Sequence, residues 1–207
     1  MIHKLPPAEI ERRSFEIIGE LLGDRALDPE KELVIKRVIH TTADFDYVDN
    51  LVFTVGAVAR GLEALRSGWD IVADTQMARA GINKRALAKL GGEVHCFISD
   101  PDVAREAGER GVTRAAVSME RAAKLEKPCI FAIGNAPTAL VALRELLDCG
   151  AVKPALIIGV PVGFVNVVES KELILEAGVP AIVARGRKGG SNVAAAVCNA
   201  LLYQLGR

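Results

Sequence analysis

The sequence predicts an α/β protein: a three-layer α/β/α sandwich on a five-stranded, mainly parallel sheet, with additional helices at the N-terminus. In the C-terminal two thirds of the 207 residues, short and nearly continuous apolar runs alternate with helical segments. This alternation is typical of a parallel sheet that helices cover on both faces. Half of the residues are apolar, which suits one large core. We therefore expect a single domain over residues 1–207 and take a flavodoxin-like strand order as the working expectation.

The N-terminal part of the chain shows the helical period. Ala8–Leu22 carries apolar residues at amphipathic spacing and predicts a first helix. Pro29–His40 predicts a second helix, with Asp28 as its N-cap and a proline in its first turn. Phe53–Ser67, which Gly68 follows, predicts a third helix.

The rest of the chain alternates strands with helices. The strand candidates, which are short and apolar, are Asp70–Ala73, Glu93–Ile98, Cys129–Ile133, Ala155–Val160 and Ala181–Ala184. The helical segments among and after them are Lys84–Leu90, Thr113–Leu125, Ala136–Cys149, Val168–Glu176 and Ser191–Leu205.

Loops rich in glycine and polar residues follow the strand candidates, at the edge where an open parallel sheet binds ligands. These loops are 74–84, 99–101, 134–138, 159–164 and 185–192. Glycines let the backbone approach a ligand closely, and the helix N-termini that follow offer free N–H groups. Arg185, Arg187 and Lys188 add positive charge to the last loop. The pattern predicts a wide site for an anionic ligand, with Asn135, Arg187 and Ser191 as candidate contacts. The plainer alternative is that Asn135 and Ser191 only cap helices.

Several ligand classes lack support in the sequence. It contains no G-x-G-x-x-G at the first strand–helix turn and no G-x-x-x-x-G-K-[ST], the fingerprints of nucleotide sites. The 26 basic and 26 acidic residues balance, which argues against broad nucleic-acid binding. We find no His, Cys and carboxylate set at metal-ligand spacing. We expect no membrane span and no signal peptide, and hence a cytoplasmic location.

His40 is the candidate for chemistry among the three histidines. It ends the second predicted helix, one turn after Arg37. His95 lies in a strand-like run, where a structural role is more common, and His3 lies close to the N-terminus. Because histidine changes charge near neutral pH, it can act as a general acid or base. Spacing alone supports a functional and a structural His40 equally.

Longer motifs occur in a fixed order along the chain. They are Arg37–His40, Gly134–Leu140, Gly159–Val165, Glu169–Lys171 and Gly186–Ser191, within a match that runs from Glu11 to Tyr203. Together these runs resemble the precorrin-8X methylmutases, a family of isomerases in cobalamin biosynthesis. Several separate matches in one order are a specific signal.

The resemblance implies an activity. The family moves a methyl group between adjacent carbons beside ring C of precorrin-8, or of its cobalt form, to give the corresponding cobyrinic acid. It implies a sigmatropic rearrangement that needs no redox cofactor, no ATP and no protein-bound metal. The substrate is a large anionic tetrapyrrole, and the resemblance implies a homodimer with its sites near the subunit interface.

The resemblance also implies functional residues. The family's catalytic histidine falls on His40, and its substrate-contacting serine and arginines fall on Ser14, Arg37 and Arg114. We expect His40 to donate a proton or hydrogen bond to the macrocycle near ring C, which would polarise the conjugated system. The arginines would pair with side carboxylates of the substrate. The macrocycle atom that His40 addresses and the subunit that supplies each residue stay open.

Two branches of the family differ in their substrate. The runs Ile39–Asp46 and Gly81–Lys84 look more like the branch that uses cobalt-loaded substrate, in which the metal arrives inside the substrate. Two other function classes remain open. One is a carrier that holds a tetrapyrrole without converting it, and the other, with less support, is a nucleotide-using α/β enzyme.

Overall fold

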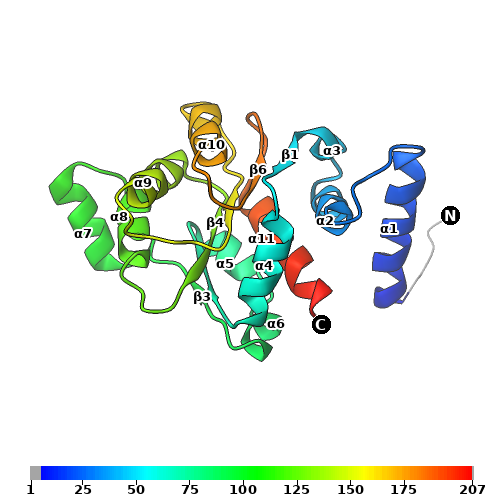
Figure 1. The fold of residues 1–207 in the computed structure, drawn as a ribbon, viewed down its shortest axis with the longest axis horizontal. Coiled ribbons are helices and arrows are strands. Elements are labelled where there is room, and N and C mark those ends of the chain that lie inside the picture. The colour runs from blue at the N-terminus through cyan, green and yellow to red at the C-terminus, as the bar shows by residue number, and fades with distance from the viewer. Residues whose placement is uncertain (1–5, 207) are drawn as a thin grey trace.

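The computed structural model describes residues 6–206, without the side chains of Pro7 and Ala8. Within this range, one sheet of six strands lies between two layers of helices (Figure 1). The predicted α/β/α sandwich is confirmed, with one strand more than expected. His3 lies outside the described residues.

The strands and helices have the following bounds. The strands are β1 Leu51–Phe53, β2 Asp70–Ala73, β3 Val94–His95, β4 Cys129–Ile133, β5 Ile157–Gly159 and β6 Ala181–Ala184. The helices are α1 Pro7–Leu22, α2 Glu32–Thr42, α3 Tyr47–Asn50, α4 Ala57–Arg66, α5 Gln76–Gly81, α6 Lys84–Lys89, α7 Pro101–Arg110, α8 Arg114–Ala122, α9 Pro137–Asp148, α10 Val167–Leu175 and α11 Ser191–Gln204.

The sheet has the strand order β1-β6-β5-β4-β2-β3. The five strands that the sequence predicts all pair in parallel. Counted along the chain, their spatial order is second, first, third, fourth, fifth, so the flavodoxin-like order is confirmed. The order reverses between β2 and β4, and such a switch point is where open α/β sheets bind ligands.

Two N-terminal boundaries differ from the prediction. Phe53–Ser67 is not one helix, because Leu51–Phe53 forms β1 and α4 begins only at Ala57. Three residues carry too little periodicity to reveal a strand; antiparallel pairing with β6 decides the conformation. The second helix begins at Glu32, and the Asp28 carboxylate accepts a hydrogen bond from the Glu30 N–H in the preceding turn. The sequence also did not reveal the short helices α3 and α5, or α7.

The two faces of the sheet bury different side chains. Along β4, Ile130 and Ala132 join a core with α2, α4 and α11, whereas Phe131 and Ile133 join a core with α8 and α9. All five residues of β4 are buried. A strand buried on both faces must be apolar throughout, which is the signal that the sequence carried.

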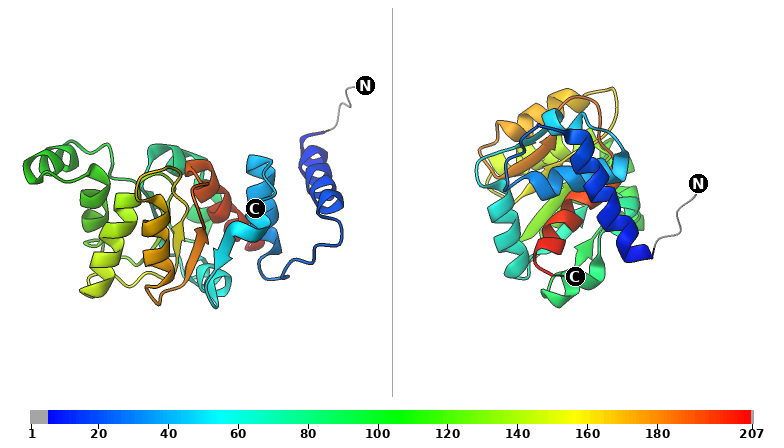
Figure 2. Two further views of the ribbon diagram at one scale, coloured as in Figure 1. Left: turned by 90° about the horizontal axis from the view of Figure 1, so that it is seen from above. Right: turned by 90° about the vertical axis from the view of Figure 1, so that its right-hand side faces the viewer.

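The helix α1 lies at one end of the long axis of the molecule and α7 at the other (Figures 1 and 2). α1 packs against α2, and α2 packs against the central helix α11. α2, which bears His40, is therefore packed between α1 and the helix layer of the sheet.

His95, for which the sequence favoured a structural role, is bonded within the protein. Its Nε2 lies 2.9 Å from Oδ2 of buried Asp70, the first residue of β2. This places the pair at the amino edge of the sheet, opposite the loops that follow the strands.

Within residues 6–206, no helix is long and apolar enough to cross a membrane.

Candidate functional site

The loops after β2 and β4 are joined by one carboxylate. Asp74, which is 1% exposed, accepts hydrogen bonds from the N–H groups of Gly134, Asn135 and Ala136, at 2.9, 2.8 and 2.8 Å. Burial raises the pKa of the Asp74 carboxyl, and the three N–H groups reduce this rise without cancelling it. The backbone donors that a bound anion would use in this loop are therefore already taken by the protein's own carboxylate.

The start of α11 packs against the loops after β2 and β4. The hydroxyls of Ser191 and Thr75 are 2.7 Å apart, and Thr75 also accepts the N–H of Ala78 as the cap of α5. A Cβ on Gly134 would lie 2.6 Å from Cα of Ser191. A glycine is therefore required where β4 passes α11. Ser191, a predicted substrate contact, has its hydroxyl bonded within the protein.

The buried side chain of Lys171 binds the loop between β6 and α11. The side chain of Lys171, on α10, is fully buried, and its Nζ donates to the carbonyls of Gly186 at 2.7 Å and Lys188 at 2.8 Å. The Gly163 N–H donates to the Arg187 carbonyl at 3.2 Å. Burial lowers the pKa of Lys171 to about 8, so the ammonium form still predominates at pH 7. The carbonyl groups of residues 186–188 are thus all bonded within the protein.

Lys188 ties the same loop to the end of α2. Its Nζ lies 2.6 Å from carboxylate oxygens of both Asp44 and Asp46. The hydrogen bond from Lys188 lowers the pKa of Asp44, and the two carboxylates raise the pKa of Lys188. α2 ends at Thr42, so these ion pairs fix the C-terminal end of α2 at the carboxyl edge of the sheet.

His40 lies in the last turn of α2 and is exposed. Its ring stacks on Phe15 of α1, with the ring centroids 5.4 Å apart and an interplanar angle of 18°. Among residues 6–206, no hydrogen bond or ion pair engages either ring nitrogen. His40 is thus oriented by stacking and keeps both nitrogens for a ligand.

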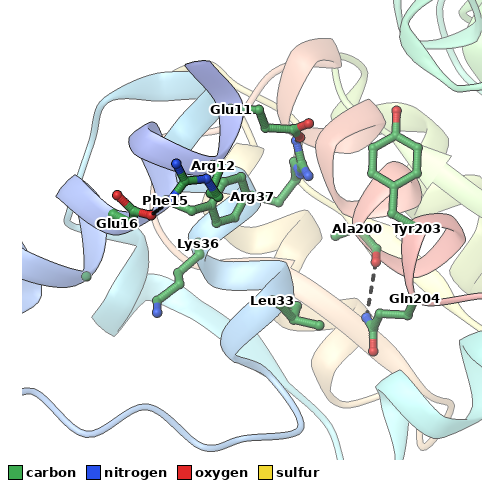
Figure 3. Close-up of a pocket in the computed structure, with 11 residues that line it drawn as sticks. Glu11, Arg12, Phe15, Glu16, Leu33, Lys36, Arg37, Ala200, Tyr203 and Gln204 are labelled. Atoms are coloured by element: carbon green, nitrogen blue, oxygen red, sulfur yellow. Dashed lines mark hydrogen bonds and ion pairs between the residues drawn. The ribbon is translucent and has the colours of Figure 1, made fainter. Parts of the chain in front are cut away.

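Arg37 holds α1, α2 and α11 together. Its guanidinium carbon lies 4.7 Å from the ring centroid of Phe15 and 5.1 Å from that of Tyr203. Its Nη1 lies 2.5 Å from Oε1 of Glu11. These residues line a groove of about 700 Å³ between the three helices (Figure 3). Only 15% of the Arg37 side chain is exposed, because its guanidinium lies against both aromatic rings while it pairs with Glu11.

Ser14 lies beside Phe15 on α1 and donates to the Ile10 carbonyl at 2.8 Å. Like Ser191, it has its hydroxyl occupied within the protein.

Apart from His40, the predicted residues whose side chains have no hydrogen bond or ion pair within the described chain are Arg114, Asn135 and Arg187, and all three are exposed. Arg114 begins α8, where the Thr113 hydroxyl donates to that of Thr138 in α9 at 2.9 Å. The three residues thus share the carboxyl edge of the sheet. Ser14, Arg37 and His40 form the second group, on α1 and α2, and the ion pairs of Lys188 connect the two groups.

Sequence reasoning missed Asp74 and the role of Lys171. A signal for Lys171 was present, since it shares the spacing i, i+3, i+4, i+7 with Val167, Ser170 and Ile174, all of which are buried. The sequence signal for Asp74 was weaker: a carboxylate directly after a buried strand. In residues 6–206, no three His, Cys, Asp or Glu side chains cluster in a way that could hold a metal ion.

Comparisons with known proteins agree with one another. A sequence model of the precorrin-8X methylmutases matches residues 9–204. A cobalt-precorrin-8 methylmutase of Salmonella typhimurium is 49% identical, over 96% of each chain, and a precorrin-8X methylmutase of Pseudomonas aeruginosa is 43% identical, over 93% of each chain. The crystal structure of a precorrin-8X methylmutase from Thermus thermophilus superposes with a TM-score of 0.86 at 40% identity, covering 94% of this chain and 96% of that one.

The packing of Gly134 generates a prediction. Gly134→Ala should lower the free energy of unfolding by about 1–3 kcal/mol, because the added methyl group meets the backbone of α11. Urea unfolding measures this. Gly108→Ala is the matched control: it lies in α7, and its Cβ would meet nothing within 4 Å. The control should be neutral or up to about 1 kcal/mol more stable. Equal stability of the two variants would contradict the close approach.

Proposed function

Since the chain belongs to the precorrin-8X methylmutase family, whose members are isomerases of cobalamin biosynthesis, we propose that it moves a methyl group between adjacent carbons beside ring C with His40 as the acid or hydrogen-bond donor. The main support for this role of His40 is the state of its imidazole ring. The ring stacks on Phe15, is exposed at the end of α2, and has no hydrogen-bond partner among the described residues.

The chemistry limits what His40 can do. In the rearrangement, the bond from one ring carbon to the methyl group breaks while a bond from the neighbouring carbon forms, so substrate and product are isomers. A proton that His40 gives to the macrocycle must therefore return within the same turnover, or stay shared as a hydrogen bond. Either form withdraws electron density from the conjugated system during migration.

Side-chain donors at the carboxyl edge are proposed to hold the substrate's carboxylates. Arg114 and Arg187 carry unpaired positive charge within the described chain, and Asn135 offers an amide. Because Asp74 occupies the nearby backbone donors, these side chains are the available anion partners. Ser191 completes this side of the proposed site through its backbone position in the first turn of α11.

Ser14 and Arg37 are proposed to contact the substrate from the side of α1 and α2. Arg37 already pairs with Glu11, so a substrate carboxylate would compete with that carboxylate for the guanidinium. We expect a weaker dependence of binding on Arg37 than on Arg114 or Arg187.

We propose that the substrate is cobalt-loaded and that the protein adds no cofactor of its own. The relative named cobalt-precorrin-8 methylmutase is more similar to this chain than the Pseudomonas relative named for the metal-free substrate. The runs Ile39–Asp46 and Gly81–Lys84 support the same branch.

A homodimer in the cytoplasm, with sites near the interface, completes the proposal. Its support is the apolar side chains of Ile10, Ile17 and Leu21, which are exposed on α1, and of Leu33, which is exposed on α2 and lines the groove. Sedimentation equilibrium would contradict the dimer by returning the mass of one chain.

His40→Ala should lower the rate of rearrangement by roughly 10²- to 10⁴-fold, since it removes the proposed donor. The measurement is the change in absorption spectrum when each protein is incubated with metal-free or cobalt-loaded precorrin-8. We expect wild-type turnover of the cobalt-loaded form and unchanged binding by the variant.

The matched control is Thr41→Ala, an exposed change at the adjacent position of α2. It should keep nearly full activity. Undiminished turnover by His40→Ala would refute the role of His40, while tight binding without conversion by the wild type would identify a carrier instead.

Arg114→Ala and Arg187→Ala should each weaken binding of the cobalt-loaded substrate by about 1.5–3 kcal/mol, roughly 10- to 150-fold, if each guanidinium binds a carboxylate. Absorption titration gives the Kd. Arg37→Ala should weaken binding less than either.

Arg66→Ala serves as the control for loss of positive charge. Arg66 is exposed at the end of α4, before β2, and so lies at the amino edge of the sheet. Equal Kd values for Arg114→Ala, Arg187→Ala and this control would place the anion site elsewhere.

A further inference from the structure

Lys171 is a buried cation that the proposed chemistry does not use. It is the largest of the fully buried side chains. No carboxylate in the described chain lies within ion-pair distance of its Nζ; the neighbouring Glu172 pairs instead with Arg185. Within residues 6–206, the hydrogen-bond partners of the ammonium are the two carbonyl oxygens of the β6–α11 loop. A charge buried in this way needs strong hydrogen bonds to persist.

The loop that it binds has little rigidity of its own. Gly186, Gly189 and Gly190 have φ angles of 81°, 158° and 139°. Between Gly186 and Gly189, the carbonyls of residues 186, 187 and 188 are all bonded: the first and third to Lys171, the second to the Gly163 N–H. With its carbonyls held inward, the loop leaves the side chain of Arg187 exposed at the carboxyl edge of the sheet.

The carboxylates near this loop pair with its other basic side chains, Arg185 and Lys188, and not with Arg187. Asp44 and Asp46 bind the Lys188 side chain, and Glu172 binds Arg185. Arg187 alone among the loop's basic side chains has no partner in the described chain. The backbone beneath it is therefore fixed while its guanidinium stays available to a ligand.

We propose that Lys171 is a positioning residue for substrate capture, which fixes the backbone of residues 186–188 from below and so presents Arg187 to a carboxylate of the substrate. This rests on the proposed function in that the bound carboxylate belongs to the macrocycle. Lys171 itself touches no substrate, because its side chain has no exposed surface.

The test uses Lys171→Met, which keeps the length and apolar stem of the side chain and removes its donors. Lys153→Met, at an exposed lysine just before β5, is the matched control. The first readout is hydrogen exchange at pH 7 at the amides of Gly163, Arg185 and Gly190, which form hydrogen bonds between this loop and the neighbouring backbone. We expect protection to fall at least about tenfold in Lys171→Met, and no change in Lys153→Met.

The second readout separates capture from chemistry. The Kd for cobalt-loaded precorrin-8, by absorption titration, should rise about tenfold in Lys171→Met while kcat at saturating substrate changes less than about threefold. If the methionine variant does not fold, Lys171→Leu, which also lacks a donor, is measured in its place with the same criteria.

Unchanged protection in a folded variant would overturn the anchoring. Lost protection with an unchanged Kd would overturn the link to substrate. Failure of the proposed function is distinguishable, because it would show as absent turnover in the wild type, whereas hydrogen exchange and Kd do not require turnover.

Discussion

At the switch point of the sheet, the Asp74 carboxylate binds three consecutive N–H groups of the loop after β4. Each bond to a charged acceptor contributes about 1.5–3 kcal/mol, and the set compensates part of the cost of burying the carboxylate. With this loop fixed, Gly134 can lie against the start of α11, and Ser191 can meet Thr75. This one buried anion thus joins the loops after β2 and β4, and through Gly134 and Thr75 it positions them against the start of α11.

The candidate site joins two parts that are held by different kinds of contact. The carboxyl edge is held by backbone hydrogen bonds and by buried Lys171. α1 is held mainly by packing on α2, with Arg37 bonded to Glu11 and placed between two aromatic rings. Sites built from a rigid scaffold and a separately held segment can close around a bulky ligand. His40 lies on α2, whose C-terminal end is joined to the carboxyl edge by the ion pairs of Lys188, and it contacts α1 through Phe15.

Much of the fold could be predicted, because a buried parallel strand such as Cys129–Ile133 must be apolar on both faces. β1 could not, since three residues at an edge are strand only through pairing with β6. For the site, motif resemblance indicated His40, and strand-end loops indicated Asn135 and Arg187. Spacing could not show that Arg37 pairs with Glu11, 26 residues away, or that Ser191 bonds Thr75, because such partners meet only in the tertiary structure. Burial of Lys171 was readable from helical spacing, but its carbonyl partners were not.

The chain has one tryptophan, Trp69, and its place has a spectroscopic consequence. Trp69 immediately precedes β2, and three strands separate β2 from β1 in the sheet. It lies in a groove with residues of α4 and with Pro154, whereas α1 packs on α2. Indole emission therefore reports the integrity of the sheet and its covering helices. Detachment of α1, with loss of the Phe15–His40 stack, would leave that signal unchanged, so an intact fluorescence spectrum and an assembled site are separate properties of this molecule.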